Sequence, residues 1–331
     1  MFEVTPAWKS AFPEAHAGVL VMRDLQLHWI SLPKGSPDDN PVENMMNKEE
    51  LKTKLDEAGL ARVSSQLLSL AKMSVRFTTT KSTDKEIPVG LSKVGGCPDL
   101  PSNQSFPKWK DVPLAFLAQI NLADISAFTA SSVLPSSGIL SFFYSATQET
   151  WGYDPKHKGS WQVYFFADLE TLERIEFPND LPEEGHYSTC SLSFFEELAI
   201  PPWESILIDE LDLSREEMDS YINLAESIIS DGSGLVNRIL GYPEQIQGDM
   251  QIECQMVSNG IYYGDAKAHE HPRYKELMPG ATDWELLLQL DSEEDSAQMI
   301  WGDVGRVYFW IHKRSLANRE FDKVWFQLQC F

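Results

Sequence analysis

The sequence predicts an α+β fold with mainly antiparallel sheets, a few peripheral helices and a duplicated β-rich unit. Strand-like segments follow one another through loops, and the helical segments are grouped apart from them, whereas a wound parallel sheet needs regular alternation of strands and helices. A set of three motifs also occurs twice in the same order. The 331 residues, 43% of them apolar, are enough for a substantial core in one large or two ordinary domains.

The repeated motifs are a Gly-x-Pro turn, an apolar run ending in Gln-apolar-Asn or Asp, and a glycine followed by an aromatic-rich run. Residues 90–144 contain the first set and residues 240–311 the second. The matched parts are Gly96 and Pro98 with Gly241 and Pro243, Gln119 and Asn121 with Gln289 and Asp291, and residues 138–144 with 305–311. We therefore expect two internal repeats, at about residues 75–167 and 235–331, with an insertion in the second.

The first 43 residues are expected to be an appended segment and linker before a main domain at residues 44–331. Residues 18–22 are apolar enough for a strand, and residues 32–41 (LPKGSPDDNP) have the composition of a linker. Asn47 is predicted to cap a helix, because Glu50 completes a capping box, and Gly59 to end it.

The main domain should then continue with a second helix at residues 61–73 and an alternating strand at residues 74–80. After the first motif set, residues 148–159 are expected to form a long connection that exposes Trp151. Further strands are predicted at residues 161–167, 190–198 and 323–331, and further helices at residues 214–230 and 249–263. Ser214 and Glu217 form a second capping box at the start of the first of these helices.

The formal charge of -23 is placed unevenly. Residues 168–226 contain 17 acidic side chains against Arg174 and Arg215, which is more than half of the net charge in under a fifth of the chain. A negative field repels phosphate backbones, so we expect no nucleic-acid partner. The alternatives are a basic protein partner, a cation, or a solubilising surface without a partner.

The four cysteines, Cys97, Cys190, Cys254 and Cys330, are far apart and form no Cys-x-x-Cys pair. This pattern argues against a zinc ribbon or redox motif and favours reduced, buried thiols in the cytoplasm. No apolar run approaches the ~20 residues that span a bilayer, and the N-terminus lacks the layout of a signal peptide. We therefore expect a cytoplasmic protein with no membrane partner.

Two groups of side chains could bind a metal ion. Asp291, Asp295 and Asp303 lie in and around an acidic loop whose carboxylates could meet at a calcium ion, or could form a solvated turn, since the calcium-loop pattern is absent. His269 and His271 could hold zinc together with Asp265, or be ordinary surface histidines beside Pro272. Neither group has the spacing of a known metal motif, so no cofactor is predicted.

The paired polar residues Gln119 and Asn121, and Gln289 and Asp291, alternate along their strands and should point the same way. Buried amides must be hydrogen-bonded, so these side chains could tie each strand to its Gly-x-Pro turn. Alternatively, they line a cleft between the repeats. The walls of such a cleft would be Trp109, Trp284 and Trp301.

Seven ordered segments together resemble the YwqG-like family of uncharacterised bacterial proteins across about residues 60–331. The segments are SKVGGCPDLP, PLAFLAQINL, LPSSGILSFFY, LGYPEQIQ, WELLLQLDS, WGDVGRVYF and FDKVWFQLQC. The resemblance implies a duplicated, cytosolic α+β protein with no established activity. Some relatives are thought to lie beside secreted-toxin genes, which suggests a toxin-neutralising or partner-binding role. Residues 1–24 resemble the opening of the tRNA-binding-like domain of the phenylalanyl-tRNA synthetase β chain, but are too short to bury a core, so no RNA function is carried over.

No nucleophile elbow, phosphate-binding glycine loop or dinucleotide fingerprint is present. The sequence therefore favours a non-catalytic module that binds a basic protein partner through an acidic surface. The alternative is a metal-assisted hydrolase or small-ligand-binding enzyme that uses the second repeat. The oligomeric state is not predicted.

Overall fold

The computed structural model describes residues 18–23, 26–31, 46–229 and 235–331. By their internal contacts the residues form two compact units, one of residues 1–40 with 228–234 and one of residues 41–227 with 235–331. In the first unit β1 (Gly18–Arg23) and β2 (Gln26–Ser31) form an antiparallel hairpin, so a strand lies where one was predicted. The predicted linker at residues 32–41 lies outside the described residues.

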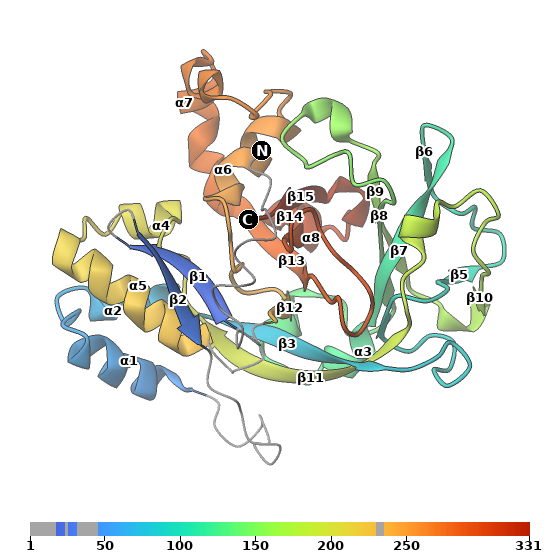
Figure 1. Ribbon diagram of the computed structural model, residues 1–331, viewed down its shortest axis with the longest axis horizontal. Coiled ribbons are helices and arrows are strands. Elements are labelled where there is room, and N and C mark those ends of the chain that lie inside the picture. The colour runs from blue at the N-terminus through green and yellow to red at the C-terminus, as the bar shows by residue number, and fades with distance from the viewer. Residues whose placement is uncertain (1–17, 24–25, 32–45, 230–234) are drawn as a thin grey trace. The chain divides into compact units, whose positions relative to one another are not determined.

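The second unit is built on one large antiparallel sheet (Figure 1). Its strands are β3 (Lys72–Lys81), β4 (Lys93–Val94), β6 (Lys108–Trp109), β7 (Val112–Asn121), β8 (Ile139–Ser145), β9 (Trp161–Phe166), β11 (Cys190–Ala199), β12 (Asn237–Ile239), β13 (Trp284–Asp291), β14 (Arg306–His312) and β15 (Trp325–Gln329). They are ordered β15-β14-β13-β12-β3-β11-β4-β7-β8-β9, with β6 beside β7. A separate pair is formed by β5 (Asp99–Pro101) and β10 (Leu172–Arg174). The predicted α+β class with mainly antiparallel sheets is confirmed.

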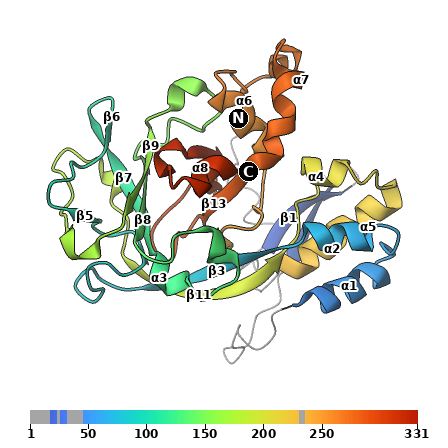
Figure 2. The same cartoon turned by 180° about the vertical axis from the view of Figure 1, so that it is seen from behind.

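The helices are short apart from three. They are α1 (Lys48–Glu57), α2 (Ser64–Leu70), α3 (Leu122–Ile125), α4 (Ile206–Asp209), α5 (Arg215–Ile229), α6 (Met250–Ser258), α7 (Tyr274–Leu277) and α8 (Lys313–Ala317). In Figures 1 and 2 alike, α1, α2 and α5 lie together beyond one end of the β3–β11 pair, whereas β5, β6 and β10 lie beyond the other.

Both predicted capping boxes are present. The Asn47 side chain accepts the N–H groups of Glu49 and Glu50, and the Glu50 carboxylate accepts the Asn47 N–H at 3.0 Å. The Ser214 hydroxyl and the Glu217 carboxylate make the same reciprocal pair at the start of α5. Each box satisfies backbone donors that the first helical turn leaves without partners.

Two predicted helices are too long. The helix predicted at residues 61–73 stops at Leu70, because Lys72 and Met73 are taken into β3, where they pair with β11. The helix predicted at residues 249–263 stops at Ser258, and Gly260 follows with a φ of +87°. A left-handed glycine just after the last turn is a common helix terminator, so this end was readable in the sequence.

The strands β3 and β11 pair along their whole length at the centre of the sheet. On one side β3 pairs with β12, which leads into the second Gly-x-Pro turn, and on the other side β11 pairs with β4, which leads into the first. The two motif sets therefore extend the central pair in opposite directions.

The ladder between β7 and β8 shifts register at residues 116–118, and the ladder between β13 and β14 shifts at residues 286–288.

Aromatic side chains join strands that are far apart in the sheet order. Phe142 of β8 contacts Phe309 of β14 with ring centroids 5.1 Å apart, and Tyr144 stacks on Phe326 of β15 at 4.0 Å. The sheet must therefore curve around one core. Each such pair contributes about 0.5–1.5 kcal/mol beyond the area it buries.

The expected exposure of Trp151 is wrong. Its ring is half-buried and packs against the core, and its indole N–H donates to the carbonyl of Gln148 at 3.1 Å. The loop is held there because the N–H of Leu328 donates to the carbonyl of Trp151 at 3.1 Å. Within the described residues, no helix has both the length and the apolar character needed to cross a membrane.

Candidate functional site

Gln119 of β7 is fully enclosed, and its amide is used within the protein. Its Oε1 accepts the N–H of Asp99 at 3.0 Å, and its Nε2 donates to the carbonyl of Leu91 at 2.8 Å and to the Asp99 carboxylate at 2.6 Å. The side chain therefore fastens β7 to the residues on both sides of the first Gly-x-Pro turn.

Gln289 of β13 makes the equivalent bonds in the second motif set. It is also fully enclosed; its Oε1 accepts the N–H of Glu244 at 2.8 Å, and its Nε2 donates to the carbonyl of Val236 at 2.5 Å. Glu244, like Asp99, directly follows the proline of the turn, and Val236, like Leu91, lies five residues before its glycine. Both glutamines thus lie between a strand and a turn.

The neighbouring pair differs between the two sets. The Asn121 amide donates to the carbonyl of Gly90 at 2.8 Å and accepts the N–H of Ala123 at 3.0 Å. The carboxylate of Asp291 instead accepts the N–H of Val236 and the Nε–H of Arg306, both at 2.9 Å. The replacement of an amide by a carboxylate is therefore matched by a cationic partner.

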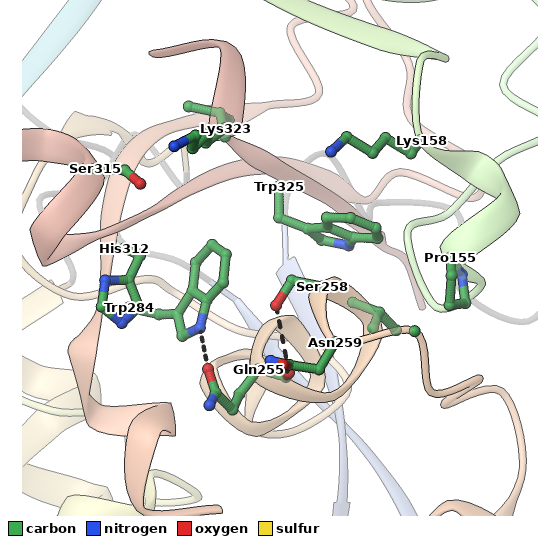
Figure 3. A pocket seen from close by; sticks show the side chains of 13 residues that line it. Pro155, Lys158, Gln255, Ser258, Asn259, Trp284, His312, Ser315, Lys323 and Trp325 are labelled. Atoms are coloured by element: carbon green, nitrogen blue, oxygen red, sulfur yellow. Dashed lines mark hydrogen bonds between the residues drawn. The ribbon is translucent and has the colours of Figure 1, made fainter. Parts of the chain in front are cut away.

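The three tryptophans proposed as cleft walls occupy different surroundings. Trp301 is fully enclosed and donates its indole N–H to the carbonyl of Asp291 at 3.1 Å. Trp109 is half-buried against the cluster that contains Phe116. Trp284 borders a hollow of about 440 Å³ (Figure 3).

The hollow in Figure 3 carries basic side chains in an acidic protein. Its lining includes Lys158, His312, Lys323, Trp284 and Trp325. The indole N–H of Trp284 donates to Gln255 and that of Trp325 to the carbonyl of Gly152, both at 2.9 Å. Lys323 forms an ion pair with Glu320 at 2.8 Å. The two indoles and Lys323 are therefore already paired within the protein.

The carboxylates proposed for calcium binding are dispersed. Asp291 is buried and forms its ion pair with Arg306, whereas Asp295 and Asp303 are exposed. The histidines lie at a 3-10 turn, residues 266–270, where the ring of His269 packs on Tyr274 at 4.9 Å and His271 accepts the N–H of Arg273. Among the residues that the structure describes, no three His, Cys, Asp or Glu side chains are grouped so that they could hold a metal ion.

A second hollow, of about 610 Å³, lies beside α6 and the edge strand β15. Its lining includes Glu253, Gln327, Gln329, Trp151, Tyr153, Tyr262, Tyr263, Asp265 and His269. Burial raises the pKa of Glu253 to about 7. The neighbouring Gln327 amide stabilises the charged carboxylate and partly opposes this rise, and the charge of Asp249 adds a smaller increase. We call this the Glu253 hollow. A carboxyl group with such a pKa in a hollow is a common feature of functional sites.

A family model described as a domain of unknown function (DUF1963) matches residues 92–330 of this chain. The chain belongs to this family. The match is consistent with the resemblance to YwqG-like proteins, and it does not include residues 1–24, whose likeness to a tRNA-binding domain stays a prediction. A comparison with curated proteins finds no match.

Within the DUF1963 region the carboxylates of residues 168–226 do not share one surface. Strand β10, which contains Glu173, and helix α5, which contains Glu216, lie far apart in both Figure 1 and Figure 2. Glu197 of β11 is half-buried and forms ion pairs with Arg76 and Arg238. Residues 168–184 expose seven of these carboxylates, and residues 209–226 expose six others. The second group, which we call the acidic ridge, consists of Asp209, Glu210, Asp212, Glu216, Asp219 and Glu226.

Sequence reasoning missed three polar residues that line the Glu253 hollow of this DUF1963 domain, Glu253, Gln327 and Gln329. Gln327 and Gln329 interrupt the closing apolar segment VWFQLQCF at alternate positions, and this pattern could have indicated a polar face on β15. Glu253 had no comparable signal, because its burial depends on how α6 packs beside β15 and the loop at residues 262–266.

Proposed function

We propose that this DUF1963 protein is a cytosolic, non-catalytic binding protein that engages a basic protein partner through the acidic ridge. The supporting observation is the ridge itself. Six exposed carboxylates lie in residues 209–226, and Arg215 is the one basic residue of that segment. Carboxylates concentrated on one segment attract a basic partner over about a Debye length and raise its rate of association.

An apolar anchor lies beside the ridge in the sequence. Trp203 is 44% exposed and precedes α4, in which the ridge begins. Exposed tryptophans surrounded by charged residues are enriched at the centres of protein interfaces. The ridge would then provide the speed and selectivity of association, and Trp203 part of the affinity.

The experiment is recovery of partners from a lysate of the native host, with the full chain as bait at low and at raised salt. In the test variant Glu210→Gln, Asp212→Asn, Glu216→Gln and Asp219→Asn remove four ridge charges. The matched control removes four exposed charges elsewhere with Glu170→Gln, Glu173→Gln, Glu183→Gln and Glu184→Gln. We expect the wild type and the control variant to retain a basic protein. The test variant should fail to retain it, and raised salt should release it from the wild type. Equal retention by both variants would contradict the proposal.

A toxin-neutralising role is the specific form of this proposal that the YwqG-like resemblance suggests. If the recovered basic partner is a toxin, co-production of the wild-type chain should restore growth of cells that make it. The four-substitution ridge variant should not restore growth, although it is produced at the same level. Rescue by the ridge variant would assign neutralisation to another surface.

The second candidate function is binding of a small ligand in a hollow lined mainly by residues 235–331. The Glu253 hollow favours it, because Gln327 is almost completely buried there and both polar atoms of its amide lack a partner among the described residues. We also infer that residues 75–167 and 235–331 arose by internal duplication, since Gln119 and Gln289 make equivalent bonds.

A further inference from the structure

The Glu253 hollow contains an unsatisfied amide at the end of the sheet. Gln327 of β15 is 1% exposed, and neither its Nε2 nor its Oε1 has a hydrogen-bond partner in the part of the chain that the structure describes. Burial of an amide without partners is unfavourable, so such a group needs an explanation. Both amide atoms are enclosed, but Gln327 lines the hollow, so a bound molecule could supply the missing partners when this side chain turns toward it.

Gln329 shows how a glutamine on this strand is satisfied when its role is structural. Its Oε1 accepts the N–H groups of Ile246 and Gln247 at 2.8 and 3.0 Å, and its Nε2 donates to the carbonyl of Gly248 at 3.2 Å. Gln327 lies two residues earlier and makes none of these bonds. The difference separates a side chain that holds a turn from one whose enclosed amide has no partner among the described residues.

The first repeat, at about residues 75–167, has aromatic rings at the matched positions of its strand β9. Tyr164 of β9 pairs with Ser141, and Gln327 of β15 pairs with Tyr308, the residue that matches Ser141 in the second repeat. In the same way, Phe166 pairs with Ile139, and Gln329 pairs with the matching Arg306. The rings of Tyr164 and Phe166 pack beside the buried Phe143. The second repeat therefore has glutamines, Gln327 and Gln329, at the positions where the first repeat has packed aromatic rings.

The walls of the hollow can contact the apolar faces of a ligand. Trp151, Tyr153 and Tyr263 are half-buried and Tyr262 is 44% exposed. The rings of Tyr153 and Tyr262 meet edge to face with centroids 5.8 Å apart, so they form one aromatic corner. Apolar walls with a few convergent polar groups are typical of small-molecule sites.

The charges of the lining restrict the class of ligand. Glu253 and Asp265 are acidic, His269 is the one residue of the lining that could become cationic, and neither lysine nor arginine is present in it. An anionic ligand would therefore be repelled. A quaternary ammonium ion would suit the aromatic rings but can neither accept from Nε2 nor donate to Oε1 of Gln327. A hydroxyl group can do both.

We propose that the Glu253 hollow binds a neutral sugar, whose hydroxyl groups pair with the Gln327 amide and the Glu253 carboxyl while its apolar face rests on the aromatic corner. This inference rests on the second candidate function and specifies its site and ligand class. It is independent of the acidic ridge. A protonated Glu253 carboxyl, present in a large fraction near neutral pH, can donate to a sugar oxygen.

The experiment uses the full chain on an array of immobilised mono- and oligosaccharides, followed by calorimetric titration with each soluble sugar that binds. Choline and sulfate are titrated in parallel as cationic and anionic probes. The test variant is Gln327→Leu, which keeps the size of the side chain and removes both polar atoms. The matched control is Gln162→Leu, at a half-buried glutamine of β9 outside the lining of the hollow.

We expect at least one sugar to bind the wild type and the control equally, and Gln327→Leu to bind it at least about tenfold more weakly, as the loss of two hydrogen bonds implies. Gln327→Leu should keep or raise the melting temperature, because it removes an unpaired buried amide. Absence of any sugar binding, or equal binding by Gln327→Leu, would overturn the site. Binding of choline or sulfate without a sugar would overturn the ligand class.

A lower melting temperature for Gln327→Leu would also count against the inference, since it would assign Gln327 a structural role. A second variant keeps the test independent of that position. Tyr262→Ala removes an exposed ring of the aromatic corner and should weaken sugar binding several-fold without changing the melting temperature. Unchanged affinity in Tyr262→Ala would exclude the proposed stacking. Partner recovery through the acidic ridge should be unaffected by either variant.

Discussion

Replacement of Gln289 by alanine tests whether the buried glutamines hold the Gly-x-Pro turns. The substitution leaves the N–H of Glu244 and the carbonyl of Val236 without their partners in an enclosed position. Each unsatisfied buried group costs about 1–3 kcal/mol, and the cavity left by the missing atoms adds about 1 kcal/mol. We therefore expect a loss of about 3–7 kcal/mol in the free energy of unfolding.

The loss can be measured by urea denaturation and by thermal melting, both followed by tryptophan fluorescence. At this chain length about 2 °C of melting temperature corresponds to 1 kcal/mol, so the midpoint should fall by roughly 6–14 °C. Gln119→Ala should give a similar loss, because Gln119 makes the equivalent bonds. The control is Gln162→Ala on the edge strand β9, which should change stability by less than about 0.5 kcal/mol.

A loss below about 1 kcal/mol for both Gln119→Ala and Gln289→Ala would refute this reasoning. It would mean that the turns are held by other contacts and that the two amides are free for another role. The alternative in which these side chains line a cleft would then become the better explanation, and ligand binding by the two variants would be the next measurement.

Three further perturbations follow from the same structure. Arg306→Met leaves the buried Asp291 carboxylate without its ion pair and should lower the free energy of unfolding by about 3–5 kcal/mol in urea denaturation; a loss below about 1 kcal/mol would contradict it. Gly95→Ala should lower the melting temperature far more than Gly59→Ala. Both glycines have a positive φ, but a Cβ at Gly95 would lie 2.1 Å from a backbone oxygen, whereas a Cβ at Gly59 would meet open space. Equal losses in melting temperature would refute the argument. Burial raises the pKa of Glu253 from 4.5 to about 7 in the folded protein. Between these two pH values the folded state therefore binds more protons than the unfolded state. The free energy of unfolding consequently decreases as pH rises through 7. The melting temperature of Glu253→Gln relative to wild type should therefore be higher at pH 8 than at pH 5, and a difference independent of pH would exclude the raised pKa.

Local sequence patterns determined the capped helix ends and most of the strands. Asn47 with Glu50 and Ser214 with Glu217 form their capping boxes within four residues, so no distant contact is needed to predict them. Gln119 and Gln289 were predicted either to tie each strand to its Gly-x-Pro turn or to line a cleft. The first alternative followed from the rule that a buried amide must be hydrogen-bonded. The motif matches, and with them the expected correspondence of Gln119 and Gln289, also came from the order of residues alone.

Tertiary structure decided the features that depend on distant partners. Lys72 and Met73 have a helical context in the sequence but join β3, because β11 offers them a full ladder of hydrogen bonds. Trp151 seemed exposed in a loop, yet Leu328, far along the chain, holds that loop against the core. Backbone pairing across the sheet outweighs local preference in both cases.

The sequence by itself fixed the fold class, the caps and the polar positions, since these follow from spacing within a few residues. It could not place Glu253 in a hollow or leave Gln327 without a partner. Burial and hydrogen bonding are properties of surroundings, and here they arise from α6, β15 and two loops that meet only in the folded chain. The acidic stretch illustrates the same limit, because folding spreads its carboxylates over distant elements, with exposed groups at residues 168–184 and at residues 209–226.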